Sequence, residues 1–193
     1  TVSAIVAAGG TPVFVDIDPD TYLIDIDKVP AALTKLTRAV IPVHLFTQMV
    51  DVERLNTMLP ESIAVIEDAA QAHGCRLRGE LAGTLGNMAA FSLYPTKNMT
   101  SVEGGMVSCA TPEIERNMRL LRNQGMDRRY DNEVVGFNAR MTDVHAAVGR
   151  VQLGKLPAWT ARRQEIAQQL DSRLENVVVP PVSPDAVHVY HQY

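Results

Sequence analysis

Lys97 is the residue of this sequence best suited to covalent chemistry. It lies in the run Phe91–Asn98, just after a short apolar segment and just before the glycine turn Glu103–Gly105. A lysine amine held at the end of a strand can condense with a carbonyl to form a Schiff base, given a lowered pKa or an activating cofactor such as pyridoxal phosphate. The alternative is an exposed loop lysine without chemistry.

Asp68 is the second candidate and lies twenty-nine residues before Lys97. In the run Ala64–Gly74 an apolar strand leads directly into two carboxylates, a glutamine and a histidine. Ligands bind at the carboxyl ends of the strands in open α/β sheets. A carboxylate there can keep a pyridinium nitrogen protonated and make a cofactor ring an electron sink. Asp68 and Lys97 fit one site, although Asp68 could instead cap a helix.

Four further polar residues follow predicted strands. The Ser92 hydroxyl lies on the strand end that precedes the lysine and could donate to a phosphate oxygen, or satisfy loop backbone. Gln71 and His73 follow the aspartate, and their alternative role is that of surface residues at a helix start. His44 ends an apolar strand, so a buried core histidine is the alternative to a role beside the substrate.

Strand and helix signals alternate between these residues. This alternation predicts a mostly parallel sheet with helices on both faces. Residues 79–86 are predicted as a loop, and Pro157 is expected to join or kink two helices. Strands are expected at 13–17, 39–45, 63–66, 89–93 and 106–109, and helices at 27–36, 50–58, 112–123, 141–153 and 159–174.

Both ends of the chain look like parts of a longer protein. The first eight residues are typical of a helix already under way, stopped by Gly9 and Gly10, while residues 188–193 alternate as a strand would. The proline-punctuated segment after residue 175 is typical of a crossing between domains. We therefore expect one large domain over residues 1–175 and the beginning of a small C-terminal domain over residues 176–193.

Composition restricts the environment and the partners. The chain has 193 residues, 46% of them hydrophobic, and a formal charge of −4, which offers no basic face for nucleic acid. No apolar run approaches the roughly 20 residues that span a bilayer, and no signal-peptide pattern opens the chain. Cys75 and Cys109 suit a reducing compartment. We expect a soluble, cytoplasmic protein without nucleic-acid or membrane partners.

The motifs, taken in order, closely resemble the DegT/DnrJ/EryC1/StrS family of pyridoxal-phosphate-dependent sugar aminotransferases. The resemblance covers nearly the whole chain. It implies the α/β fold type I of pyridoxal-phosphate transferases, which is aspartate-aminotransferase-like, with this chain forming the middle of the family's sequence. The matching segments are Gly9–Asp16, Ile41–Phe46, Val65–Gly74, Phe91–Asn98, Glu103–Val107 and Val135–Asp143.

The resemblance also implies roles for individual residues. Lys97 would carry pyridoxal phosphate as a Schiff base and serve as the proton-transfer base. Asp68 would hold the ring nitrogen protonated, Ser92 would contact the phosphate, and Gln71 would lie near the ring and its hydroxyl. Asn138 resembles the asparagine that a neighbouring subunit donates to the phosphate, which implies a homodimer.

On the substrate side, the resemblance implies roles for His44 as an active-site histidine and for His73 close to the ring and its hydroxyl. Thr47 replaces a common glycine and Ala139 a frequent aromatic residue, which leaves the particular sugar open. Lysine at position 97 favours transamination, because the dehydratases among the relatives have histidine there.

The implied reaction is a ping-pong amino transfer from glutamate or glutamine to a nucleotide-linked keto-sugar. A keto-cyclitol or related cyclic ketone is an alternative acceptor. A metal-dependent hydrolase using His44, Asp68 and His73, and a non-catalytic regulatory relative, are the competing classes. Because the family's N-terminal phosphate-binding segment would precede residue 1, we expect the chain alone to be inactive and to bind the cofactor weakly.

Overall fold

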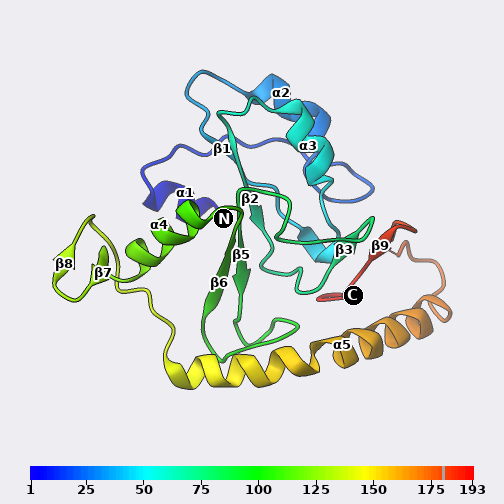
Figure 1. The fold of residues 1–193 in the computed structure, drawn as a ribbon. Helices are drawn as coiled ribbons and strands as arrows, with labels where there is room; N and C mark the ends of the chain where they lie inside the picture. Colours follow the sequence, from blue (N-terminus) through cyan, green and yellow to red (C-terminus); the bar gives the residue numbers. More distant parts are fainter. Residues whose placement is uncertain (180) are drawn as a thin grey trace.

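A computed structural model describes residues 1–179 and 181–193, and its centre is a four-stranded sheet in the order β1-β2-β5-β6 (Figure 1). Three strands are parallel: β1 (Ala39–Val40), β2 (Ala64–Asp68) and β5 (Met88–Ser92). The fourth strand, β6 (Gly105–Cys109), runs antiparallel to β5. The expected mostly parallel sheet is confirmed, with one antiparallel edge.

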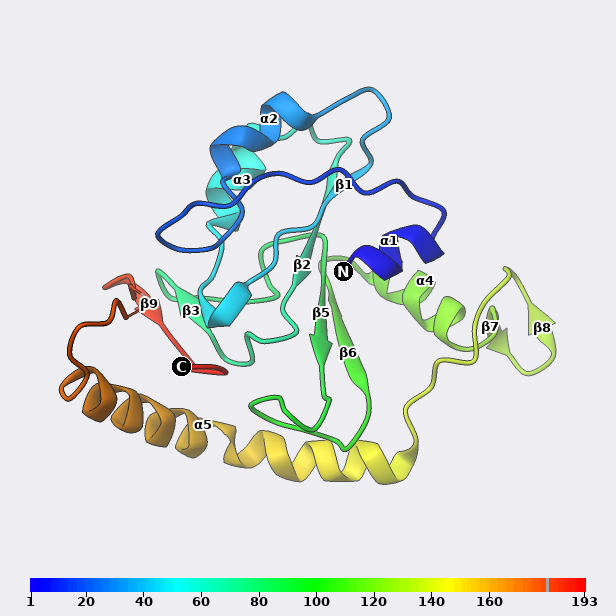
Figure 2. The same cartoon turned by 180° about the vertical axis from the view of Figure 1, so that it is seen from behind.

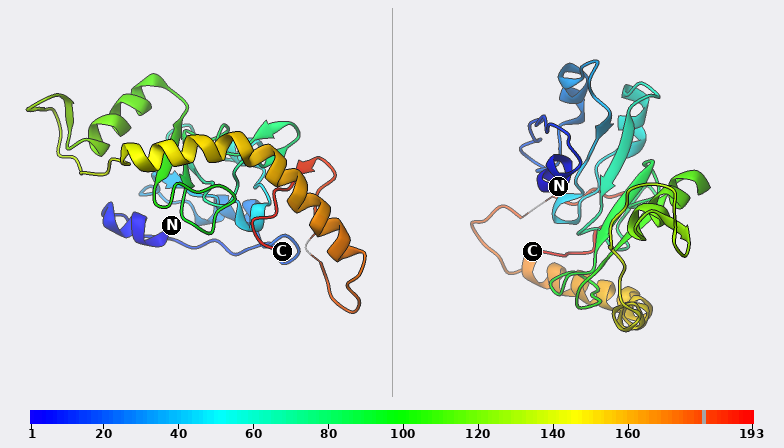
Figure 3. Two further views of the ribbon diagram at one scale, coloured as in Figure 1. Left: turned by 90° about the horizontal axis from the view of Figure 1, so that it is seen from below. Right: turned by 90° about the vertical axis from the view of Figure 1, so that its left-hand side faces the viewer.

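Helices lie on both sides of this sheet and across its lower end (Figures 1 and 3). On the Val65 side of β2, Val29, Val52 and Leu55 from two of the helices bury their side chains against Val40 and Val65. The helices are α1 (Val2–Ala7), α2 (Val29–Ala32), α3 (Val52–Met58), α4 (Pro112–Arg122) and α5 (Asp143–Asp171), with 3₁₀ turns η1 (Ile26–Lys28) and η2 (Leu45–Thr47).

Local capping explains where the longer helices begin. Thr111 accepts from the backbone amide of Ile114 at 3.3 Å at the start of α4, and Thr142 accepts from His145 at 3.2 Å at the start of α5. The amino terminus lies beside β2 and β5 on the Asp68 side (Figure 2). The helix expected within the first eight residues is confirmed as α1, which spans Val2–Ala7.

Two small sheets were not expected. In the first, β3 (Arg76–Leu77) pairs with β4 (Glu80–Leu81) and with β9 (Ala186–Val187), so the expected loop 79–86 begins as a hairpin. The second consists of β7 (Met126–Arg128) and β8 (Asp131–Asn132). Pairing of β9 with β3 brings the C-terminal residues back to the central sheet (Figure 1).

The strand expected at residues 13–17 is wrong. Only Ile17 forms an isolated bridge, with Ile24, and Phe14 is 79% exposed because no neighbouring strand covers this segment. The expected strand 39–45 is reduced to β1, since Pro42 has no backbone amide with which to continue the ladder. Beyond it, Val43 makes a single parallel bridge to Asp68.

One predicted helix is shorter in the structure, and two others are joined. The helix predicted at residues 27–36 is only η1 followed by α2, because the Thr34 and Thr37 hydroxyls bond to nearby backbone and each other instead of allowing a further helical turn. The helices expected on either side of Pro157 are joined, as predicted, into one continuous helix, α5, whose axis bends along its length (Figure 3). Leu156 packs against Leu93 and Met99 at this point, and this packing favours a continuous helix despite the hydrogen bond lost at proline.

The predicted domain boundary near residue 175 stays a prediction. α5 ends at Asp171, residues 172–179 and 181–185 form neither helix nor strand, and β9 begins at Ala186. Among residues 1–179 and 181–193, no helix combines the length and the hydropathy needed to cross a membrane.

Candidate active site

Asp68 is the last residue of β2 and lies at the carboxyl edge of the parallel strands. Its carboxylate accepts from the backbone amide of Ala70 at 3.2 Å and from the hydroxyl of Thr1 at 2.5 Å. The side chain is half-buried. A carboxylate with so few partners keeps acceptor capacity for a further donor.

Ser92 shares both the edge and the face of Asp68. The parallel register places Asp68 opposite Ala90, so Ser92 lies one side-chain repeat further toward the same edge. Since alternate residues of a strand point to one face, the side chains of Asp68, Ala90 and Ser92 lie on the same side of the sheet. The Ser92 hydroxyl accepts from the amide of Tyr94 at 3.3 Å, which leaves its own proton available.

Lys97 follows on the loop between β5 and β6. The loop is closed at its base, where the amide of Leu93 donates to Gly104 at 2.9 Å and the amide of Ser101 donates to Leu93 at 3.0 Å. Gly104 has φ +147°, and a Cβ there would approach the Ser101 hydroxyl to 2.8 Å, so only glycine fits. Lys97 itself is half-buried.

His73 lies under this loop and has no hydrogen-bond partner among the described residues. It is 5% exposed, both ring nitrogens are buried, and its ring packs against Phe91 with centroids 5.6 Å apart. Burial lowers the pKa of His73 to about 4, and the nearby positive charge of Lys97 adds to the effect. The Ser92 backbone opposes the shift without reaching hydrogen-bond geometry. His73 is therefore neutral near pH 7.

The side chain of Gln71 is held by a hydrogen bond from a distant segment of the chain. Its side-chain oxygen accepts from the amide of Phe46 at 3.0 Å, across twenty-five positions of sequence. Phe46 has a left-handed backbone, with φ 52°. The amide NH₂ of Gln71 has no protein acceptor in the described chain and so can donate to a bound group.

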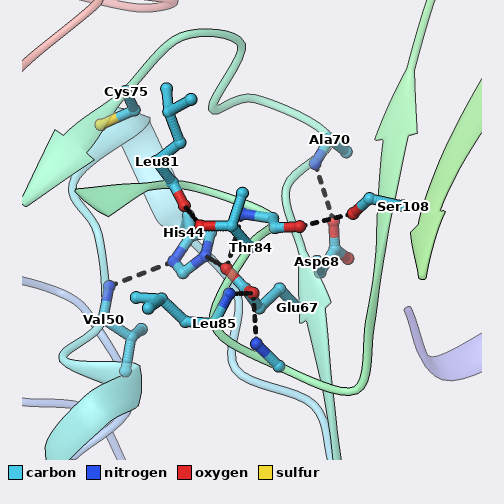
Figure 4. Close-up of polar contacts among 12 residues, drawn as sticks. His44, Val50, Glu67, Asp68, Ala70, Cys75, Leu81, Thr84, Leu85 and Ser108 are labelled. Carbon is cyan, nitrogen blue, oxygen red and sulfur yellow. Dashed lines mark hydrogen bonds and ion pairs between the residues drawn. The ribbon is translucent and has the colours of Figure 1, made fainter. Parts of the chain in front are cut away.

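His44 belongs to the core rather than to an accessible site. It is 0% exposed, its Nε2 lies 2.9 Å from the Glu67 carboxylate, and its Nδ1 accepts from the amide of Val50 at 3.1 Å (Figure 4). Both ring nitrogens are therefore engaged. This environment fits the core alternative for His44, and its predicted role beside the substrate stays a prediction.

Glu67 is a buried structural partner of His44 that sequence reasoning missed. It too is fully buried, and besides His44 it accepts from the amides of Gly83, Leu85 and Gly86 at 2.7 to 2.9 Å. Burial alone would raise the pKa of Glu67, but these donors hold it below its usual value. The Glu-Asp pair in the sequence carried no signal as to which carboxylate turns inward.

Asn138 is not brought to Asp68 and Lys97 within this chain. It is exposed on the segment between β8 and α5, where its backbone bridges to Asn123 at the end of α4. Its side chain makes no hydrogen bond within the described residues. Its predicted role across a subunit interface stays a prediction.

The C-terminal segment supplies residues that the sequence did not single out. The Thr47 hydroxyl lies 2.8 Å from Nε2 of His188, and the side-chain amide of Asn98 donates to the carbonyl of Val189 at 2.7 Å. His191 has a buried Nδ1 without a partner among the described residues. Contacts between residues 141 and 91 positions apart leave no local pattern in the sequence. The only sequence signal for this segment was the strand-like alternation of residues 188–193.

An open cavity of about 580 Å³ lies elsewhere, at the amino ends of β1 and β2, lined in part by Leu33, Arg38 and Ile63. It is at the opposite sheet edge from the candidate residues. Across residues 1–179 and 181–193, no three His, Cys, Asp or Glu residues are grouped to hold a metal ion.

Fold and site together define an α/β chain of the pyridoxal-phosphate transferase fold type I, aspartate-aminotransferase-like. The chain belongs to the DegT/DnrJ/EryC1/StrS aminotransferase family, whose model matches residues 1–193.

Individual relatives agree with this family. The chain is 40% identical to a GDP-perosamine synthase of Caulobacter vibrioides, covering 99% of this chain and 53% of that protein, and 40% identical to a pleiotropic regulatory protein of Geobacillus stearothermophilus, covering 100% and 54%. The crystal structure of DesV from S. venezuelae superposes with a TM-score of 0.92 at 36% identity, covering 99% of this chain and 54% of that one. The chain thus spans about half the length of these relatives.

Proposed function

We propose that this protein is a pyridoxal-phosphate-dependent aminotransferase that moves an amino group from glutamate or glutamine to a nucleotide-linked keto-sugar. The observation that carries the proposal is the shared sheet edge: Asp68 and Ser92 lie on one face, and the loop bearing Lys97 starts directly after Ser92. Membership of an aminotransferase family supports it.

The donor set fits pyridoxal phosphate. An amine, a carboxylate and a hydroxyl are the groups that its aldehyde, ring nitrogen and phosphate require. Ala90 is exposed between Asp68 and Ser92, and its neighbour Val107 on β6 is 47% exposed. The uncovered apolar sheet face beside the carboxylate suits a flat aromatic ring.

Each residue then has a distinct task. When bound, pyridoxal phosphate supplies an electron sink that stabilises the carbanion formed at the donor's α-carbon. The Lys97 amine would hold the cofactor through its aldehyde and, when free, would accept and return the α-proton of the donor. The Asp68 carboxylate would accept a hydrogen bond from the protonated ring nitrogen. Ser92 and the NH₂ of Gln71 donate hydrogen bonds that orient the cofactor.

The proposal includes a homodimer in which Asn138 reaches the neighbouring subunit's phosphate. Val135 and Phe137, just before it, are 93% and 70% exposed. Large apolar side chains so exposed on one short segment are typical of an interface with another protein surface. This segment is therefore the part of the chain that we expect a second subunit to cover.

We also assign the protein to the cytoplasm. Cys75 and Cys109 are both free, and Cys75 donates from its thiol to the Thr47 carbonyl at 2.9 Å. Burial raises the pKa of Cys75 to about 12, so this thiol is inert. Unpaired thiols are the usual state in a reducing compartment.

Assays of the complete protein test the function. With glutamate or glutamine as donor, we expect transfer to a nucleotide-linked keto-sugar and little transfer to a free keto-cyclitol. Faster turnover of the keto-cyclitol than of the keto-sugar would show that the acceptor is a cyclitol instead. Absence of transfer to any cyclic ketone, from either donor, would favour a regulatory protein instead.

A further inference from the structure

Asn98, the residue after Lys97, is tied to the far end of the chain. Its side-chain nitrogen donates to the Val189 carbonyl at 2.7 Å, and the residue is only 4% exposed. A buried amide–carbonyl hydrogen bond of this length fixes both groups, because breaking it leaves a buried polar group unpaired. The backbone beside Lys97 is thus anchored to the C-terminal segment.

Val189 in turn packs beneath the turn that follows Asp68. It is fully buried in a cluster with Ala69, Ala72 and Cys75. Through Val189, the Asn98 hydrogen bond connects the loop of Lys97 with the segment that begins at Asp68. The two principal residues of the site therefore share one structural support.

α5 holds this support from the other side. Gln164 donates to the carbonyl of His188 at 2.9 Å, and Arg163 donates to the carbonyl of Tyr190 at 3.0 Å. The carbonyls on either side of Val189 therefore bond to α5, while its own carbonyl bonds to Asn98. Residues 188–190 form a strap between α5 and the Lys97 loop.

The other side of Lys97 lacks such an anchor. The preceding residues Tyr94, Pro95 and Thr96 are exposed, and the amide of Lys97 bonds only to the carbonyl of Tyr94 within this same turn, at 3.0 Å. Asn98 is consequently the first buried side chain on either side of the lysine that bonds outside its own loop.

We propose that Asn98 is a positioning residue for Lys97: its hydrogen bond to Val189 fixes the lysine relative to Asp68 and makes the site depend on the strap 188–190. The inference rests on the proposed role of Lys97. The nearby His191 agrees with it, because burial and then the charges of Lys97 and Arg163 lower its pKa, which places the lysine close to the strap.

The first test is Asn98→Asp in the complete protein, which keeps the shape but replaces the donor by an acceptor that faces the Val189 carbonyl. Misplacing a reacting group by about 1 Å costs on the order of 10²-fold in rate. We expect kcat to fall by roughly 10- to 100-fold, with the KM for the amino donor nearly unchanged.

A second readout separates positioning from general destabilisation. In cofactor-free protein, well below the unfolding temperature, acylation of Lys97 by an amine reagent is followed by mass spectrometry. We expect several-fold faster acylation in Asn98→Asp, approaching the rate of the loop residue Lys35. Gln152→Glu is the matched control, since its side chain accepts from the amide of Thr100 at 3.4 Å in the same loop and still can do so.

If Asn98→Asp does not fold, Gln164→Leu decides, because it loosens the strap without touching the loop. Acylation of Lys97 should again rise, by a smaller factor. An unchanged acylation rate of Lys97 in whichever variant folds would overturn the inference. So would an increase in Gln152→Glu as large as that in the test variant. Failure of the proposed function is recognised separately, by transaminase activity that survives Lys97→Ala.

Discussion

Glu67 and Asp68 are adjacent carboxylates with opposite environments, and this difference organises the site. Because neighbouring strand residues face opposite sides of a sheet, Glu67 turns into the core and Asp68 to the other face (Figure 4). Four groups donate hydrogen bonds to the Glu67 carboxylate, two to each oxygen. Asp68 meets only Thr1 and Ala70. One carboxylate is structural and the other is available for chemistry.

Replacing Lys97 by Ala in the complete protein is expected to abolish transamination. The variant loses both the Schiff-base anchor and the base that moves the proton, so kcat should fall by more than the roughly 10² to 10⁴ attributed to general-base loss alone. Steady-state kinetics with a saturating donor measures this. Activity close to that of the unaltered protein would remove Lys97 from the mechanism.

Replacing Glu67 by Gln should destabilise the fold. The substitution removes the buried charge that accepts hydrogen bonds from His44 and three backbone amides. It also turns the new NH₂ group toward other donors. We therefore expect a loss of about 1.5–3 kcal/mol in the free energy of unfolding. Urea denaturation at pH 7 measures it. Glu53→Gln, whose carboxylate lies in an exposed pair with Arg78, is the control and should cost at most about 1 kcal/mol.

The Glu67 effect should also depend on pH. Because the folded-state pKa of Glu67 is below its unfolded value near 4.5, its contribution to stability is present above that pH and is lost as the pH falls through the folded pKa. The difference between the unaltered protein and Glu67→Gln should therefore shrink below about pH 4.5. An unchanged difference at acid pH would show that the charge of Glu67 contributes nothing.

At the scale of elements, α5 supports the site although it contributes no candidate residue to it. Leu156 packs on Leu93 and Met99, which bracket the Lys97 loop, and two further residues of the helix hold the strap 188–190. Figure 1 shows the helix lying across the carboxyl end of β5. A single long helix thus braces both the loop and the C-terminal segment.

Leu156→Ala should reveal this support. Removing a buried leucine side chain costs about 2–5 kcal/mol, as lost burial plus the cavity left behind. The expected result is that loss in urea denaturation, together with faster proteolysis within the Lys97 loop. Leu153→Ala on the same helix, where the side chain is 57% exposed, is the matched control. Equal effects of the two substitutions would contradict the assigned packing.

At the scale of the molecule, the chain does not bring Asn138 to the other candidate residues. Asn138 lies at the end of the segment 133–138, away from the sheet edge, while Asp68, Ser92 and Lys97 share that edge. In the proposed homodimer, Asn138 of one subunit would complete the site of the other. This makes subunit exchange a direct test of the arrangement.

Mixing two impaired variants should restore activity. In a dimer of one Lys97→Ala subunit and one Asn138→Asp subunit, one site receives an intact lysine from one chain and an intact asparagine from the other. After exchange at equal amounts, roughly a quarter of the original activity should return, from simple dimer statistics. No recovery, with hybrid dimers verified by mass spectrometry, would place Asn138 outside the neighbouring site.

The 193-residue chain alone should bind pyridoxal phosphate weakly. Ser92 supplies one hydroxyl, and in the proposed site a further phosphate donor, Asn138, would come from a second subunit. Each missing charge-assisted hydrogen bond is worth about 1.5–3 kcal/mol. A titration that follows the absorbance of the cofactor–lysine adduct checks this, and saturation at low micromolar cofactor would contradict the account of the phosphate site.

The sequence by itself determined the local chemistry. Short runs of sequence predict a strand that leads to Asp68, a second strand end at Ser92 and a glycine-bounded loop that carries Lys97. They can do so because strand ends and turns depend on neighbouring residues. The caps Thr111 and Thr142 are equally local. The mostly parallel sheet also followed from the alternation of strands and helices.

Only the tertiary structure decided which polar groups face inward and which distant segments meet. His44 became a core residue because Glu67 and Val50 engage both its nitrogens. β9 joined β3, and Asn98 found Val189, through contacts between segments about a hundred residues apart. Such pairings are selected by burial and hydrogen-bond satisfaction of the whole chain at once, and no short pattern in the sequence records them.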